Sequence, residues 1–126
     1  MPIALTPNKK WDYVLREDRG LPPDKQTIFK LKALSSEEFF AIQNIQYTNG
    51  FGTANQSVLI IGLVGWENFL DNQGQAVPFN LEDGACAQEN LDRLTPAIMM
   101  ELIGAIRKRN ELSEDEIKNS PSGDAS

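Results

Sequence analysis

Apolar and polar positions change their period several times along the chain, and each change predicts a different element. Over Trp11–Arg16 apolar residues partly alternate with charged ones, which is typical of a strand with one buried face. The alternation returns over Thr27–Lys32, with Phe29 and Leu31 on one side. Because a turn that contains two prolines separates these runs, we expect a short antiparallel pair.

Helical signals follow the two strands. Ser35 and Glu38 form a capping box, in which each side chain bonds the other residue's backbone N–H, so a helix should begin there. It should end near Gln46–Asn49. Another helix should begin at Thr95-Pro96, because threonine caps a helix and proline fits its first position. The apolar face of that helix carries Met99, Leu102, Ile103 and Ile106.

The segment Ala54–Phe69 has apolar residues around most of a helical wheel, so its period does not decide its structure. We predict a central, mostly buried helix. A buried strand over Val58–Leu63 stays as the alternative, because three of its residues are β-branched. Asp71–Gly74 then predicts a turn, and Pro78 excludes a central strand from the extended piece that follows.

Together these elements predict an α+β fold that is mainly helical, with a short N-terminal antiparallel β-pair followed by three to four helices. Residues 1–10 contain two prolines, and we expect a flexible arm there. Residues 11–118 should form a single α+β domain, with a second capping box at Ser113–Glu116 starting a last short turn. Residues 119–126 have no apolar anchor, so we expect a disordered tail.

Composition narrows the kinds of catalytic, disulfide and metal site that the chain can form. The 126 residues contain no histidine and only one cysteine, which excludes Ser-His-Asp and Cys-His enzymes, internal disulfides and CxxC metal sites. A reduced, intracellular setting fits best. The longest apolar stretch, Val58–Trp66, is about half of the roughly 20 residues that a membrane-spanning helix needs, so we expect a soluble protein without a membrane partner.

Charge points to protein partners. The formal net charge of −6 argues against duplex DNA and anionic membranes. The negative charge is concentrated in residues 33–106, which carry one Lys or Arg against nine Asp or Glu. We therefore expect an acidic body that binds other proteins.

Motifs for catalysis or ligand binding are weak. Gly50-Phe51-Gly52 lacks the third glycine of a dinucleotide fingerprint, and Asp71–Gly74 lacks the spacing of an EF-hand, so we interpret them as a loop and a turn. Cys86 is expected to fill space inside the protein. Arg107–Arg109 fits a helix C-terminus, with an acidic partner or nucleic acid as the alternative. Carboxylates in a predicted solvated loop are the remaining candidates for a cation or acid/base site: Glu82, Asp83, Glu89 and Asp92. We expect no catalytic residue, cofactor or metal.

Trp66 and Phe69 are the most suggestive aromatic residues, because aromatic side chains anchor many protein interfaces. They are also usual occupants of cores, and that interpretation stays open. We predict a partner-binding surface that joins Trp66 and Phe69 to the edge of the last helix at Met99 and Ile103. Apolar stripes on an acidic body would hold amphipathic helices of a partner, with carboxylates setting their orientation.

A resemblance to a known family rests on four segments, Tyr13–Phe29, Leu34–Phe39, Gly62–Phe69 and Leu112–Asn119. They resemble small proteins encoded among the tail genes of long-tailed bacteriophages and prophages, the tail assembly chaperones. The resemblance implies a non-enzymatic protein of the host cytoplasm that is absent from the mature virion. It implies binding to the tape measure protein, whose hydrophobic helices are kept from aggregating, and recruitment of the tail tube protein. Self-association of the chain is a further option.

Two other classes stay open. A structural virion component, such as a minor tail, head–tail joining or decoration protein, would have the same α+β make-up. A host-directed inhibitor or a DNA-binding regulator would use the basic N-terminal arm and Arg107–Arg109, although the net charge argues against DNA. An enzyme would depend on the carboxylates alone.

Overall fold

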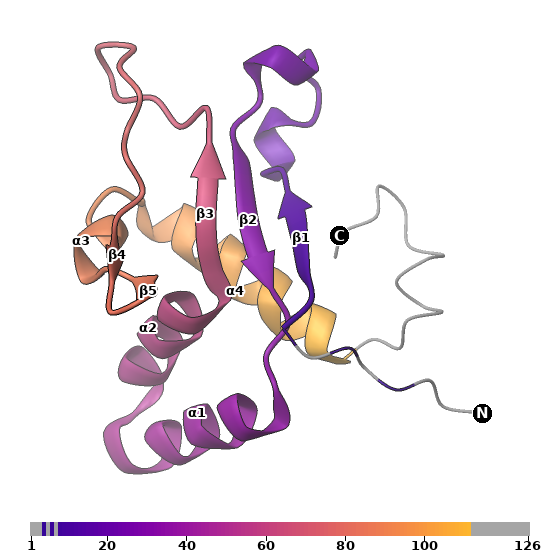
Figure 1. Cartoon of the computed structure of the whole chain (residues 1–126), viewed down its shortest axis with the longest axis vertical. Coiled ribbons are helices and arrows are strands. Elements are labelled where there is room, and N and C mark those ends of the chain that lie inside the picture. The colour runs from indigo at the N-terminus through magenta and orange to yellow at the C-terminus, as the bar shows by residue number, and fades with distance from the viewer. Residues whose placement is uncertain (1–3, 5, 7, 112–126) are drawn as a thin grey trace.

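A three-stranded antiparallel sheet forms the centre of the molecule in the computed structural model, which describes residues 4, 6 and 8–111 (Figure 1). β1 (Lys10–Tyr13) pairs with β2 (Ile28–Lys32), and β2 pairs with β3 (Leu63–Glu67). Two 3-10 turns, η1 (Arg16–Asp18) and η2 (Pro23–Lys25), connect β1 to β2. The predicted antiparallel pair is therefore present, but it belongs to a larger sheet.

Three helices lie around this sheet, two of them at one end and the third behind it. α1 (Ser36–Asn49) and α2 (Phe51–Gly62) form a helical hairpin between β2 and β3, at the lower end of the sheet in Figure 1. α4 (Pro96–Glu111) crosses behind the sheet. An α+β fold follows from this arrangement, as the sequence predicted.

A small hairpin and a short helix complete the described chain. β4 (Leu81–Glu82) pairs with β5 (Ala85–Cys86), and α3 (Gln88–Leu91) follows. Asp83 and Gly84 form the two-residue turn between the strands, with φ of 53° and 80°. Positive φ at both positions is the geometry that Asp-Gly favours in tight hairpins.

The hydrophobic core lies between the inner face of the sheet and α4. Alternation along β2 turns Phe29 and Leu31 inward, where both are fully buried. α4 contributes Leu102 and Ile106, which are also fully buried. Other large side chains with almost no exposure are Tyr13, Ile42, Val58, Leu59 and Leu63.

Both predicted helix starts are confirmed by their caps. Ser35 Oγ accepts a hydrogen bond from the Glu38 N–H at 3.1 Å, and Glu38 Oε1 accepts one from the Ser35 N–H at 2.8 Å. Thr95 Oγ1 accepts a bond from the Ile98 N–H at 3.2 Å. These bonds satisfy N–H groups that have no partner within the first helical turn.

The prediction of one helix over Ala54–Phe69 is wrong beyond Gly62. The helix starts earlier, at Phe51, and changes directly into β3. The strand alternative for Val58–Leu63 is wrong as well, because that stretch is helical up to Gly62. The apolar run suits either structure, and its last part becomes a strand because β2 offers backbone partners to Leu63–Glu67.

The N-terminal arm is described only in part, and residues after 111 are not described. Asn8 donates its N–H to the Ala33 carbonyl at 2.9 Å, and β1 begins at Lys10, so the last residues of the expected arm bond to the sheet region. The second capping box, Ser113–Glu116, and the expected tail of residues 119–126 lie outside the described residues.

Candidate functional site: an apolar hollow on the open face of the sheet

The structure buries Trp66 and packs the partly buried Phe69 against the core. Trp66 is 9% exposed, and its Nε1 donates a hydrogen bond to the Val77 carbonyl at 2.8 Å. Its ring packs edge to face against Phe69 and Phe79, with centroids 5.0 and 4.8 Å away. Because the indole is buried and its N–H is satisfied, it offers a partner little surface. The core interpretation describes these aromatics.

Met99 and Ile103 lie on the inner side of α4. Ile103 is 5% exposed, and Met99 is partly buried against the core. The exposed edge of this helix carries Met100, which is 57% exposed. The spacing that marks an apolar helix face is the same for a core and for an interface, so the sequence could not separate the two. Of the four predicted partner-binding residues, Trp66 and Ile103 are therefore buried and Phe69 and Met99 are partly buried, and their role in binding stays a prediction.

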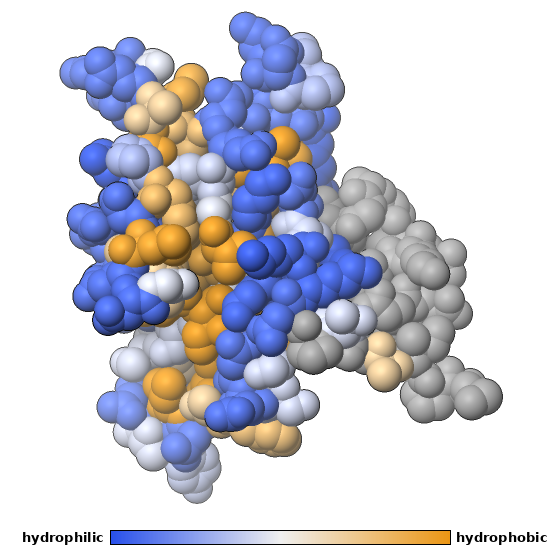
Figure 2. All heavy atoms as spheres, in the orientation of Figure 1, coloured by the Kyte–Doolittle hydropathy of each residue, from blue (hydrophilic) through white to orange (hydrophobic). Residues whose placement is uncertain are grey.

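The open face of the sheet offers a different site. Figure 2 shows an apolar band that runs down the middle of this face between hydrophilic margins. Within it lies a hollow of about 300 Å3 between the sheet, the end of α2 and the β4–β5 hairpin. Its residues are Lys10, Lys32, Glu38, Ile60, Ile61, Leu63, Val64, Leu81, Gly84, Ala85 and Cys86. We call this site the sheet hollow.

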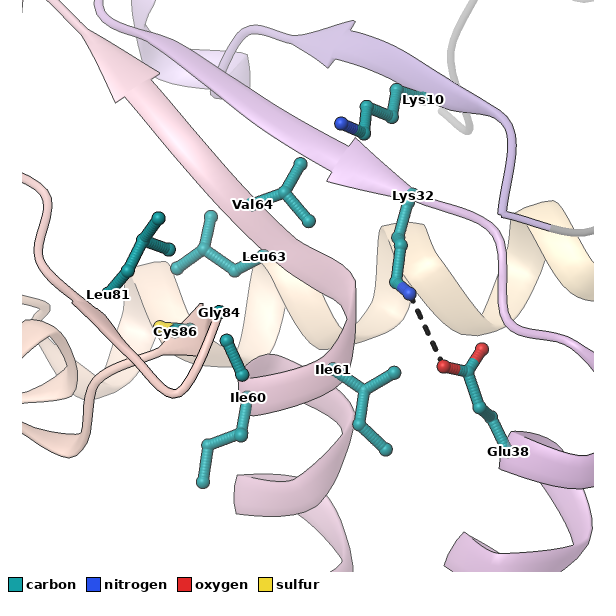
Figure 3. Close-up of a pocket in the computed structure, with 11 residues that line it drawn as sticks. Lys10, Lys32, Glu38, Ile60, Ile61, Leu63, Val64, Leu81, Gly84 and Cys86 are labelled. Carbon is teal, nitrogen blue, oxygen red and sulfur yellow. Dashed lines mark hydrogen bonds and ion pairs between the residues drawn. The ribbon is translucent and has the colours of Figure 1, made fainter.

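The sheet hollow has an apolar floor and one charged wall (Figure 3). Ile60, Ile61 and Val64 are partly exposed in the floor, and Leu81, on the opposite side from the lysines, is 63% exposed. Partly exposed branched aliphatic side chains lose unfavourable contact with water when an apolar group covers them. The hollow can therefore accept apolar side chains of a partner.

The charged wall is basic with one paired carboxylate. Lys32 Nζ lies 3.3 Å from Glu38 Oε2 and 3.0 Å from Asn8 Oδ1. Burial raises the pKa of Glu38, but hydrogen bonds from Ser35 and the Lys32 ammonium outweigh it, so the pKa lies below its usual value. Lys10 forms no ion pair with another described residue. Its side chain is exposed, so a carboxylate beside the apolar floor could approach its ammonium group from solvent.

Asn90 holds the β4–β5 hairpin in its place beside the sheet. This side chain is 1% exposed, and it donates to the Asn80 carbonyl at 2.7 Å and accepts from the Asn80 N–H at 3.0 Å. The two bonds fix the chain immediately before Leu81. A buried amide is stable only when its hydrogen-bonding groups are paired, which explains this arrangement.

The sequence contains one signal for this site, and the predicted solvated loop did not take it into account. Asp83-Gly84 between Leu81-Glu82 and Ala85-Cys86 is a strong signal for a two-residue hairpin turn. No comparable local signal marks Asn90, and none predicts that Ile60, Ile61 and Val64 lie beside the hairpin. Their meeting depends on tertiary packing.

The structure also shows where the other candidate residues for chemistry lie: the carboxylates, Cys86 and the cations of α4. The predicted solvated loop is wrong for two of its carboxylates, since Glu82 lies in β4 and Glu89 in α3, but all four carboxylates are exposed: Glu82, Asp83, Glu89 and Asp92. The described residues contain no group of three or more His, Cys, Asp or Glu that could hold a metal ion. Cys86 is buried as expected, and burial raises the pKa of its thiol. Two cations near the end of α4 make internal contacts, since Arg107 bonds Asn55 and the Arg109 guanidinium lies 4.1 Å from the Trp11 ring centre.

Comparisons with known proteins add no relative: no family model, curated protein or solved structure matches the chain. Within residues 4, 6 and 8–111, no helix has the length and apolar character needed to cross a membrane.

Proposed function

We propose that this protein is a non-enzymatic tail assembly chaperone of a long-tailed phage or prophage. It binds the tape measure protein in the host cytoplasm, helps to recruit tail tube subunits, and leaves before the virion is complete. The observation that carries the proposal is the sheet hollow, with its uncovered apolar floor of Ile60, Ile61 and Val64.

The chemistry of the hollow fits one kind of partner segment. An amphipathic helix presents apolar side chains at every third or fourth position, and these fill a shallow apolar site. A carboxylate next to them would meet the Lys10 ammonium, which orients the helix. The proposal therefore specifies a tape measure helix that carries an Asp or Glu beside its apolar stripe.

Capture of the tape measure protein tests the site. In co-expression with the tape measure protein of the same phage, the wild-type chain should keep it soluble and co-purify with it. Leu81→Asp and Lys10→Glu should each reduce the captured amount about tenfold or more, because they place a charge of the wrong sign or kind at the hollow.

Matched variants control for the chemical change itself. Leu21 is 43% exposed on the connection between β1 and β2, and Lys25 is exposed in η2. Leu21→Asp and Lys25→Glu should capture as much as the wild type. Normal capture by both hollow variants would show that the partner binds elsewhere. Failure of the wild type to capture at all would contradict the chaperone function.

The main alternative is a structural virion component, and it differs in where the protein ends up. Mass spectrometry of purified particles should find the chain absent or at trace level if it is a chaperone. Recovery in a fixed ratio to the tail tube protein would instead assign it to the particle.

A further inference from the structure

The α1–α2 hairpin carries no charge after its first turn. Between Glu38 and Glu67 the sequence has no Asp, Glu, Lys or Arg, although 24% of all residues are of these types. This stretch contains most of α1 and the whole of α2. Loss of charged residues together with enrichment in aromatics is the composition of interface centres.

Large aromatic side chains on this hairpin are exposed. Phe40 is 65% exposed, Tyr47 is 93% exposed, and Phe51, at the start of α2, is 69% exposed. Phe40 and Tyr47 are seven residues apart in one helix, so they project from the same side two turns apart. Asn44 is exposed between them. We group the exposed, uncharged residues Phe40, Asn44, Tyr47 and Phe51 of this hairpin as the aromatic face, of which the first three share one side of α1.

We propose that the aromatic face binds the same face of a second copy of this chain, with the two α1 helices antiparallel across a two-fold axis. An axis near Asn44 places Phe40 of each copy opposite Tyr47 of the other. Asn44 then meets its own copy, and an amide both donates and accepts hydrogen bonds. The spacing of the face is therefore complementary to itself.

The distribution of charge favours the aromatic face over other surfaces as the place where two copies of this chain can meet. Each chain has a formal net charge of −6, so two copies repel one another over most orientations. The aromatic face contributes nothing to this repulsion, because its residues are uncharged. It is a surface at which burial of apolar area is not opposed by local like charges.

The exposed aromatic area supplies most of what a dimer interface needs. From their exposed fractions, the three aromatic side chains offer on the order of 450 Å2 per copy, or about 900 Å2 for a pair. Specific interfaces begin near 1,000 Å2 in total, and neighbouring polar residues of α1 supply the rest. A groove of about 220 Å3 beside Phe40, lined also by Leu34, Phe39 and Asn110, offers space for the opposing Tyr47 ring.

Mass in solution tests the dimer. Sedimentation velocity of the full chain from about 5 to 200 µM should show a shift from one-chain to two-chain mass. Tyr47→Lys and Phe40→Glu should each weaken the dimer about tenfold or more, since each places a charge in an apolar contact. Leu21→Lys, an exposed leucine outside the face, should leave it unchanged. A wild-type chain that stays monomeric, or a Tyr47→Lys variant that dimerises normally, overturns the proposal.

A mixing experiment tests the antiparallel arrangement. The F40E and Y47K variants are each expected to be monomeric, but an equimolar mixture should form a heterodimer, because the new carboxylate of one copy faces the new ammonium of the other. A mixture that stays monomeric would overturn this arrangement. The dimer is independent of the sheet hollow, so its failure would leave the chaperone proposal unaffected.

Discussion

α4 and α1 have similar lengths, 16 and 14 residues, but they place their apolar side chains differently. α4 buries Leu102, Ile103 and Ile106 against the sheet, whereas Ile42 is the buried residue of α1. Apolar residues of α4 share one side, and those of α1 are spread around the helix. Apolar content alone therefore does not measure what a helix contributes to the core.

Replacing aromatic side chains should give the largest contrast between the core and the aromatic face. Trp66→Ala should lower the free energy of unfolding by about 3–5 kcal/mol, because it leaves a cavity and removes the hydrogen bond to the Val77 carbonyl. Tyr47→Ala should change it by less than about 0.5 kcal/mol in a monomeric, dilute sample. Urea unfolding measures both. Equal losses would mean that α1 contributes more to the fold than its burial indicates.

Alanine substitution at two glycines should change the stability of the fold in opposite directions. A Cβ on Gly62, at the end of α2, would lie 2.7 Å from Ile106 Cδ1, so Gly62→Ala should cost about 1–3 kcal/mol. Gly104, on the exposed side of α4, has no atom within 4 Å of its Cβ position, and Gly104→Ala should stabilise by about 0.5–1 kcal/mol. Thermal unfolding separates the two variants. A neutral Gly62→Ala would show that the contact between α2 and α4 adapts easily.

Removing the two helix caps should lower stability by amounts that differ less than those of the glycine variants. Ser35→Ala should cost about 1 kcal/mol, because it breaks a bond within the reciprocal capping box that starts α1. Thr95→Ala should cost somewhat less, since its hydroxyl accepts a bond from the Ile98 N–H but the reciprocal bond of a capping box is not seen among the described residues. Denaturant midpoints compare the two. A larger loss for Thr95→Ala would reverse this order.

The smallest expected effect is a pH dependence of α1. The pKa of Glu38 lies below its usual value of 4.5, so the ionised carboxylate stabilises the fold above that pH, and this stabilisation is lost as the pH falls through the lower folded pKa. The stability difference between wild type and Glu38→Gln should therefore shrink on acidification from about pH 7 to 3. Glu37→Gln, an exposed neighbour in the same turn, is the control. A difference that is constant with pH would contradict the assignment.

Local signals predicted much of the fold. The capping box at Ser35, the Thr95-Pro96 start and the alternation around Phe29 all lie where the sequence placed them, because each depends on neighbours within a few residues. The third strand was missed. Val58–Trp66 is apolar without a clear period, so its structure depends on β2 and α4, which are distant in sequence.

The candidate site was less predictable than the fold. Trp66 and Ile103 had the composition and spacing of an interface, yet they are buried in the core. The sheet hollow combines residues that are far apart in sequence, such as Lys10 and Leu81, and no local pattern joins them. The uncharged stretch after Glu38 was visible in the sequence, but its exposure on α1 required the structure.

The direct passage from α2 to β3 has a consequence for which changes in length the gene can tolerate. One added residue at Gly62–Leu63 would rotate the preceding helix by about 100° relative to the strand or shift the strand so that its inward residues point outward. Either change misplaces the core. Insertions should instead be accepted at the tip of the exposed turn Asp71–Gly74, because the Leu70–Ala76 bridge and the Val77 N–H bond to the Phe69 carbonyl hold the two sides of the turn together whatever the length of its tip. Natural variants of this protein should therefore vary in length at that turn and keep the helix-to-strand junction constant.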